Sequence, residues 1–499
     1  MKAMKKITGI VLAFIMVLAM STVAFADDAT TYTITINNPS GSYEAYQIFT
    51  GDLSTNDDNE TVLSNIEWGT GVTAEAKEAL GTAAAYAKNL TDAKAFANTL
   101  ASNNYVSDTT TGTYADGQIT GLTAGYYLIK NVDDSVSGEG TFYTDYIIEV
   151  VKDVTVTPKG DVPTVEKKVQ DINDSEDSAL SELQDSADYD MGDSVPFTLT
   201  GTLPTNLADY TTYYYEFHDT LSKGLTYDRN IVVYKNSVDD TNDITEGFAI
   251  TALATADGAT DISIQCSDIK ALGLKASDKI IVKYTATLNE NANIGSAGNP
   301  NEVYLEYSNS PKQSSGGEGE ENPHGNTPSD KVIVFTYKVV VNKVDANQKP
   351  LAGAAFTLYK MNEATGEYEE YKVVETTPVY GEDGTTVVSY TSNFLGVDDG
   401  DYKLVETTTP AGYNTSNPVE FTVSATHDTE SDNPQLTALN GGELGTGDVT
   451  TGAITTEVIN RGGAVLPSTG GFGTTAIYVI GIIAAAGAAI ALAARKRRA

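Results

Sequence analysis

The chain has 499 residues and a formal net charge of -37, with 68 acidic against 31 basic residues. So acidic a surface repels phosphate backbones and anionic headgroups, which argues against nucleic acid as a partner. The single cysteine, Cys266, excludes an intrachain disulfide. Three histidines scattered along the sequence without ligand spacing, and no P-loop or nucleophile beside a base, predict no metal site, no cofactor and no turnover of an external substrate.

The first residues have the pattern of an export signal. Three lysines precede an apolar stretch over residues 7–20, and Ala24-Phe25-Ala26 fits a small-x-small cleavage site. We expect residues 1–26 to be a secretory signal peptide and the exported chain to begin near Asp27.

Alternating runs rich in Thr, Val and Tyr, separated by Gly, Asn and Asp turns, dominate the rest of the chain. They predict an all-β protein of tandem sandwich domains. Because the length exceeds one core, we expect an N-terminal domain (27–160), a middle domain (161–329) and a C-terminal domain (330–462). An Ala-, Glu-, Lys- and Leu-rich stretch near residues 73–101 predicts a helical insert. The polar segment 314–330 indicates a linker or mobile loop.

A lysine stands at the end of the first domain, in Val154-Thr155-Val156-Thr157-Pro158-Lys159-Gly160. Pro158 removes a backbone donor and ends the strand, so we expect Lys159 on an exposed turn. Exposure is what an acceptor amine for an intermolecular bond requires. A plain surface lysine is the alternative.

In the middle domain, strand alternation points three polar residues inward: Lys167, Asp219 and Asn301. Val165 and Val169 share the face of Lys167. Lys168 is the adjacent alternative, and strand facing alone favours Lys167.

The C-terminal domain repeats this arrangement with Lys343, Glu406 and Asn460, each on the face that apolar neighbours define. Lys338 lies on the same strand with the opposite facing and is the alternative lysine. The alternative is that these three residues do not meet in the core but lie separately at strand ends, exposed to solvent.

Buried polar sets of this kind must pair internally, since an unpaired buried charge is costly. Burial favours a neutral amine, which is a nucleophile, and a neutral acid, which is a hydrogen-bond donor. Lys343 can then attack the side-chain carbonyl of Asn460 while Glu406 polarises it, and ammonia leaves. The product is an intramolecular isopeptide bond that joins the first and last strands.

The chain ends in Leu466-Pro467-Ser468-Thr469-Gly470, an apolar run over residues 474–494, and a basic cluster over 495–498. The run is long enough to cross a hydrocarbon core, and the basic cluster should stay cytoplasmic. The pentapeptide in this context resembles the sorting signal of Gram-positive cell-surface proteins, so residues 463–499 are expected to be a sorting signal, membrane segment and basic tail. That resemblance implies a sortase that cleaves between Thr469 and Gly470.

Other motifs resemble the domains of Gram-positive pilins. Lys343-Val344-Asp345, Leu351-Ala352-Gly353-Ala354 and the segment around Glu406, an E-box, resemble a CnaB-type domain. The set Lys167, Asp219 and Asn301 resembles the triad of the CnaA-type, Ig-like middle domain of major pilins. The run that ends in Lys159 matches the pilin motif only in part, because Thr157 and Val150 replace its Tyr and Trp.

The resemblance implies a backbone pilin of a cell wall-anchored surface pilus, with a precursor held transiently in the membrane. A pilin-type sortase would join Thr469 of one subunit to Lys159 of an identical one, and a housekeeping sortase would attach the polymer to peptidoglycan. Minor pilins and host or environmental ligands are further implied partners. A monomeric wall-anchored adhesin is the alternative. A secreted carbohydrate-active enzyme has little support, because no recognisable pair of catalytic carboxylates stands in the sequence.

Overall fold

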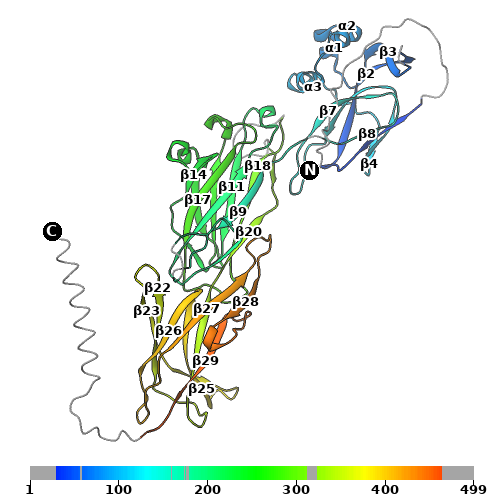
Figure 1. The fold of residues 1–499 in the computed structure, drawn as a ribbon. Coiled ribbons are helices and arrows are strands. Elements are labelled where there is room, and N and C mark those ends of the chain that lie inside the picture. The colour runs from blue at the N-terminus through cyan, green and yellow to red at the C-terminus, as the bar shows by residue number, and fades with distance from the viewer. Residues whose placement is uncertain are drawn as a thin grey trace, which may run out of the picture.

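The protein consists of three β-rich bodies arranged end to end in a computed structural model (Figure 1). Sheets dominate each body, which confirms the all-β expectation. Among the described residues, no helix is long and apolar enough to cross a membrane, and the span expected at 474–494 lies outside them. The structure describes residues 30–463 except 57–58, 159, 174, 176–178 and 312–322.

The N-terminal domain has three layers. One sheet packs on a second sheet through a core around Ile34 and Tyr127, and helices cover the other face of the second sheet through a core around Phe49 and Phe96. The first sheet is β4 (Thr113–Ala115), β5 (Gln118–Leu122), β1 (Tyr32–Ile36) and β8 (Val154–Val156). The second is β3 (Thr61–Trp68), β2 (Tyr43–Thr55), β6 (Gly125–Asn131) and β7 (Asp145–Val150).

The expected helical insert is a series of short helices rather than one. The Thr73 hydroxyl caps the first by accepting from the Ala76 N–H at 3.2 Å, and Gly81 ends it with a φ of 79°. A residue with a positive φ breaks the helical path, so a new helix must begin after it. In the described residues the insert comprises α1 (Ala74–Leu80), α2 (Ala83–Lys88) and α3 (Ala93–Ser102).

The middle domain is a sandwich of two sheets around one large core. One sheet is β10 (Ser186–Asp188), β20 (Asp330–Phe335), β18 (Asn299–Ser308), β12 (Tyr215–Leu221), β16 (Thr260–Cys266) and β15 (Ala249–Ala254), with β19 (His324–Asn326) beside β18. The facing sheet is β13 (Leu225–Tyr227), β17 (Lys279–Leu288), β11 (Ser194–Thr202) and β9 (Thr164–Val169), with β14 (Val232–Lys235) beside β17. Short 3₁₀ helices are η1 (Leu207–Asp209), η2 (Asp240–Asn242), η3 (Thr245–Gly247) and η4 (Ile269–Leu272).

The C-terminal domain is a second sandwich, with its own core around Phe356 and Tyr402. One sheet is β24 (Thr377–Tyr380), β25 (Val387–Val397), β21 (Tyr337–Asp345) and β29 (Ala453–Asn460). The other is β23 (Glu367–Glu375), β22 (Ala355–Asn362), β26 (Gly400–Thr408), β27 (Val419–His427) and β28 (Leu436–Asn440), and η5 (Gly442–Leu444) precedes β29.

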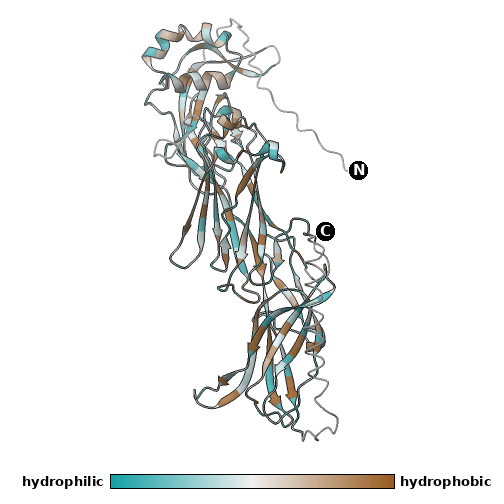
Figure 2. Cartoon of the chain, turned by 90° about the vertical axis from the view of Figure 1, so that its left-hand side faces the viewer, coloured by the Kyte–Doolittle hydropathy of each residue, from teal (hydrophilic) through white to brown (hydrophobic). Residues whose placement is uncertain are grey.

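Hydrophobic and hydrophilic residues alternate along the strands of both sandwiches (Figure 2). In β17, for example, every second residue from Ile280 to Leu288 is buried. Cys266 is also buried, as its place beside Ile262 and Ile264 on one strand face predicts. This alternation decides which polar side chains enter the cores.

The two sandwiches share a continuous stretch of chain. β20 pairs with β18 and β10 of the middle domain, and β21 begins after Thr336 in the C-terminal sheet. Val332 and Val334 pack in the middle core, whereas Phe335 packs in the C-terminal core. The C-terminal domain is expected to begin at residue 330, which is the first residue of β20. Because β20 pairs with strands of the middle domain, the chain enters the C-terminal sheet only after Thr336.

Candidate functional site

The predicted polar set of the middle domain lies between its two sheets. Lys167 comes from β9, while Asp219 on β12 and Asn301 on β18 come from the facing sheet. β12 and β18 are neighbours in register, with Leu221 opposite Asn301, so Asp219 and Asn301 point into the same layer. All three side chains are at most 1% exposed.

The three groups are linked through a fourth, Tyr284 on β17. Lys167 Nζ lies 2.5 Å from Asp219 Oδ1, and the Tyr284 hydroxyl donates to Asp219 Oδ2 at 2.6 Å. Asn301 Nδ2 donates to the same hydroxyl at 2.7 Å. Asn301 Oδ1 is buried and accepts no hydrogen bond from the described residues.

Electrostatics distinguishes Lys167 from its neighbour Lys168. Burial lowers the pKa of Lys167, although the charge of Asp219 and its hydrogen bond oppose the shift. Lys168 is partly exposed and contacts Asp185 on the far side of the strand. Lys167 is thus the lysine whose amine lies inside, beside an acid that can take its proton.

The predicted set of the C-terminal domain is also buried. Lys343 on β21 lies opposite Val458 of the parallel strand β29, and Asn460 lies one pleat further along the same face. Glu406 on β26 reaches them from the facing sheet. Lys343 and Asn460 are fully buried, and Glu406 is 4% exposed.

In this set the acid holds the amide nitrogen. Asn460 Nδ2 donates to Glu406 Oε2 at 3.0 Å and to the Asn414 carbonyl at 2.7 Å, and the Ser416 N–H donates to Glu406 Oε2 at 2.7 Å. Glu406 Oε1 and Asn460 Oδ1 are buried without a hydrogen-bond partner among the described residues. Unsatisfied buried oxygens of this kind call for an explanation.

The Lys343 amine lies in the same core but bonds elsewhere. Its Nζ donates to the carbonyls of Val458 at 3.0 Å and Val344 at 3.1 Å. Burial lowers its pKa, and the negative charge of Glu406 acts in the opposite direction. Lys338 is only partly buried on the other face of β21, so the buried lysine of this strand is Lys343.

Six predicted site residues lie outside the described residues: Lys159, Leu466, Pro467, Ser468, Thr469 and Gly470. On either side of Lys159, β8 ends at Val156 and β9 begins at Thr164, at the junction of the N-terminal and middle domains. The last described residues, after β29, leave the C-terminal domain at the end farthest from that junction (Figure 1). The described residues next to Lys159 and those next to the sorting signal thus lie at opposite ends of the pair of sandwiches.

Two family models match the sandwiches. The Gram-positive pilin backbone subunit 2, Cna-B-like domain matches residues 191–311, and the SpaA prealbumin-like fold domain matches residues 337–435. The chain carries the domains of a Gram-positive backbone pilin. Each match lies within a domain that holds a buried lysine, acid and asparagine, although Lys167 and Asn460 fall outside the matched ranges.

Relatives of these backbone-pilin domains include the trypsin-resistant surface T6 protein of Streptococcus pyogenes serotype M6, which is 26% identical over 240 residues. That alignment covers 45% of this chain and 42% of the relative, so it spans less than half the length of either protein. The solved structure of the T6 backbone pilin of the same serotype, with a modular three-domain structure, superposes with a TM-score of 0.53 at 18% identity. It covers 89% of this chain and 100% of that one, which shows a shared fold.

Sequence reasoning missed Tyr284, which contacts all three members of the middle set. Burial raises its pKa well above the usual value, and Asp219 adds to the shift, so the hydroxyl stays protonated and can donate. The signal in the sequence was a single tyrosine at an inward position of β17, otherwise occupied by Ile280, Val282, Ala286 and Leu288. A tyrosine there is equally consistent with plain core packing.

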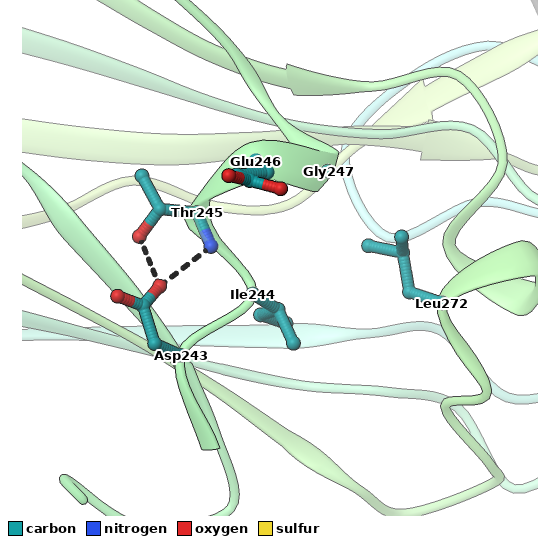
Figure 3. A pocket seen from close by; sticks show the side chains of 6 residues that line it. All are labelled: Asp243, Ile244, Thr245, Glu246, Gly247 and Leu272. Atoms are coloured by element: carbon teal, nitrogen blue, oxygen red, sulfur yellow. Dashed lines mark hydrogen bonds between the residues drawn. The ribbon is translucent and has the colours of Figure 1, made fainter. Parts of the chain in front are cut away.

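A surface depression of the middle domain offers no comparable chemistry. It has a volume of about 410 Å³ and lies beside η3 and Leu272 (Figure 3). The Asp243 carboxylate accepts from the Thr245 N–H at 2.8 Å and from its hydroxyl at 2.6 Å, so it caps the turn. No histidine, cysteine or lysine is among the described residues that line it.

The histidines, scattered in sequence, each meet a carboxylate in space. His218 Nε2 lies 3.1 Å from Glu306 and 3.4 Å from Glu216, and His324 Nδ1 lies 2.6 Å from Glu306. Burial lowers the pKa of His218, but hydrogen bonds and charges from Glu216 and Glu306 outweigh it and raise the pKa to about 9. Hydrogen bonds from His218 and His324 lower the pKa of Glu306 to about 2. His427 likewise lies 3.3 Å from Asp188.

We expect this network to make stability depend on pH. His218 contributes fully below its unfolded pKa of 6.5, and its contribution disappears as pH rises through about 9. Glu306 contributes above 4.5 and loses its contribution as pH falls through about 2. His218→Gln should therefore lower the free energy of unfolding near pH 6. We expect a loss of only about 1 kcal/mol, because the side chains of His218 and Glu306 are both partly exposed to solvent. Chemical denaturation of both proteins should show this difference shrinking toward pH 9.5; a constant difference would contradict the assignment.

Proposed function

We propose that the protein is the structural backbone subunit of a covalent surface pilus, stiffened by two intramolecular isopeptide bonds. One observation carries the proposal: each domain that matches a pilin family model buries a lysine, an acid and an asparagine in one layer. Burying three such groups has a cost that packing alone does not repay. A bond that converts amine and amide into a neutral secondary amide removes that cost.

In the middle domain, the side chains of the buried set can supply every proton transfer that the bond-forming reaction needs. Asp219 accepts the proton of Lys167, whose neutral Nζ attacks Cγ of Asn301. The bond from Cγ to Nζ forms, the bond from Cγ to Nδ2 breaks, and the departing nitrogen leaves as ammonia. The Tyr284 hydroxyl lies between Asp219 and Asn301 Nδ2, so once it turns to donate toward that nitrogen it can relay the proton from Asp219 to the departing group. Asp219 then takes up the second proton that Nζ loses as the amide forms.

In the C-terminal domain the acid touches the leaving nitrogen directly. Glu406 lies against Asn460 Nδ2, so as Lys343 Nζ attacks Cγ it can take up the proton that Nζ loses and pass it to Nδ2, which leaves as ammonia. The Lys343 amine must turn from the carbonyls of Val344 and Val458 toward Asn460, a change confined to its side chain. The step occurs once per subunit and acts on no external substrate, so the protein is not an enzyme in the ordinary sense.

The polymer linkage follows from the two ends. A sortase would cleave after Thr469 and pass its carbonyl to Lys159 of the next identical subunit, giving a head-to-tail shaft. The last subunit would be joined to peptidoglycan of a Gram-positive wall, with minor pilins as further partners. The described flanks of Lys159 and of the sorting signal lie at opposite ends of the two sandwiches, which supports end-to-end assembly.

Polymerisation is tested by Lys159→Ala in cells that export the protein. Boiled, detergent-treated wall extracts of the wild type should give a ladder of high-mass species, and the variant should give a single band. Lys152→Ala, which changes an exposed lysine of the same domain, is the matched control and should keep the ladder. A ladder that survives Lys159→Ala refutes this acceptor, and a single band for the wild type would favour the monomeric wall-anchored adhesin.

A further inference from the structure

A β-hairpin of the C-terminal domain extends beyond the hydrophobic core. It consists of β24 and the first residues of β25, joined by a turn over residues 381–386. All four residues of β24 are exposed. Val379, Tyr380 and Val388 are 40% to 54% exposed, and none of them packs in the C-terminal core. The hairpin therefore presents apolar surface that the sandwich does not bury.

β24 is also an open edge of its sheet. It pairs with β25 and, in the part of the chain that the structure describes, with no other strand. An edge strand presents N–H and C=O groups to which a strand of another chain can pair. A partner strand would cover this edge and the apolar side chains beside it together.

The hairpin lies at the end where the chain leaves the C-terminal domain. Thr391 of β25 pairs with Asn342 of β21, which pairs with Glu457 of β29. Residues 387–390 therefore lie level with the end of β29. Ile459, which is 39% exposed, adds apolar surface at this end. β24 and β29 are three strands apart in the sheet, which corresponds to roughly 14 Å.

The linkage between subunits limits where the next subunit can lie, and this step rests on the proposed function. Thr469 stands six residues after Gly463, so it lies at most about 20 Å from it. The amine of Lys159 in the next subunit must reach Thr469. Because the hairpin lies within a similar distance of the chain exit, the surface around that lysine faces the hairpin.

An open strand edge precedes Lys159. β8 is the last strand of its sheet and pairs with β1 alone among the described residues. It ends at Val156, three residues before Lys159, in the N-terminal domain at the other end of the molecule (Figure 1). Thr155 in its centre is exposed. The acceptor region thus offers the complementary half of a strand pair.

We propose that the hairpin of β24 and β25 docks on the β8 edge of the next identical subunit, beside the lysine that receives the sorting signal. Each chain has a formal charge of -37, so two copies repel one another and their overall charge does not hold them together. Strand pairing and apolar contact supply the attraction instead. Docking keeps the amine near the incoming threonine and so raises its effective concentration in the sortase step.

Photocrosslinking in cells that export and polymerise the protein tests this contact. With p-benzoylphenylalanine in place of Tyr380, residue 380 should crosslink to residues 154–164, and the same probe in place of Thr155 should capture residues 377–390. Such crosslinks must join two copies, because β8 and the hairpin lie at opposite ends of one subunit (Figure 1). Leu395, 39% exposed at the other end of β25, is the matched control and should give no crosslink to β8.

A double variant, Val379→Ser with Tyr380→Ser, tests the consequence for assembly. It should lower the amount of high-mass species by about tenfold, because the amine loses its effective concentration. Its Tm should stay unchanged, since neither side chain packs in the core. Leu395→Ser should keep the wild-type ladder.

The outcomes separate this contact from the polymer itself. A wild-type ladder without crosslinks between residue 380 and β8, or with crosslinks to residues 464–469 instead, would overturn the docking site and leave the polymer standing. An unchanged ladder in the double variant would do the same. A wild type without any ladder would overturn the polymer and this contact with it.

Discussion

Glu406→Ala is expected to leave Lys343 and Asn460 unjoined. Residues 27–465 of the wild type should weigh less than their sequence by two molecules of ammonia, and the variant by one. The lost bond closes a loop of roughly 120 residues, which by analogy with a disulfide stabilises by about 5 kcal/mol. Intact-mass spectrometry and denaturant unfolding of the C-terminal transition check both effects.

Glu369→Ala is the matched control for this experiment. Glu369 lies exposed on β23 of the same domain, so its removal should leave both ammonia losses in place. A wild-type mass equal to the sequence mass would refute both isopeptide bonds at once. A Glu406→Ala protein that still lacks two ammonia molecules would show that the C-terminal bond forms without this acid.

Strand alternation was sufficient to find the two buried sets. It places Lys343 on the face of Val339 and Val341, and the structure buries Lys343 while Lys338 stays partly exposed. The same rule selects Lys167 over Lys168. Alternation works here because each strand has one face in a core, and a slip of one residue would expose that whole face.

Pairing between distant segments was beyond this reasoning. The expected C-terminal domain starts at residue 330 because the sequence keeps its β character through Thr336, although the chain passes from one sheet to the other there. The hydrogen bond from the Met191 N–H to the Gly396 carbonyl depends on how two domains dock, which no local pattern encodes. Tyr284 was overlooked for a related reason, since its role depends on three partners from other strands.

Asp219→Ala should have the largest effect in the middle domain. It removes the acceptor of the Lys167 proton and leaves a fully buried lysine without its carboxylate, a change that typically costs about 3–5 kcal/mol. The missing bond between β9 and β18 adds about 5 kcal/mol by the same loop argument. We expect the mass of this variant to show one ammonia loss, and its middle domain to unfold at far lower denaturant. The double variant with Glu406→Ala should show none, with nearly additive costs because the two sites lie in separate cores.

Tyr284→Phe separates the bond-forming chemistry from packing at this site. It keeps the ring that stacks on Phe197 but removes the hydroxyl between Asp219 and Asn301. If that hydroxyl relays the proton to the departing nitrogen, freshly folded Tyr284→Phe should lose its middle-domain ammonia more slowly than the wild type, as a time course of intact mass would show. An unchanged rate would mean that Asp219 reaches Asn301 without the tyrosine, and the acid would then be the sole proton carrier in both domains.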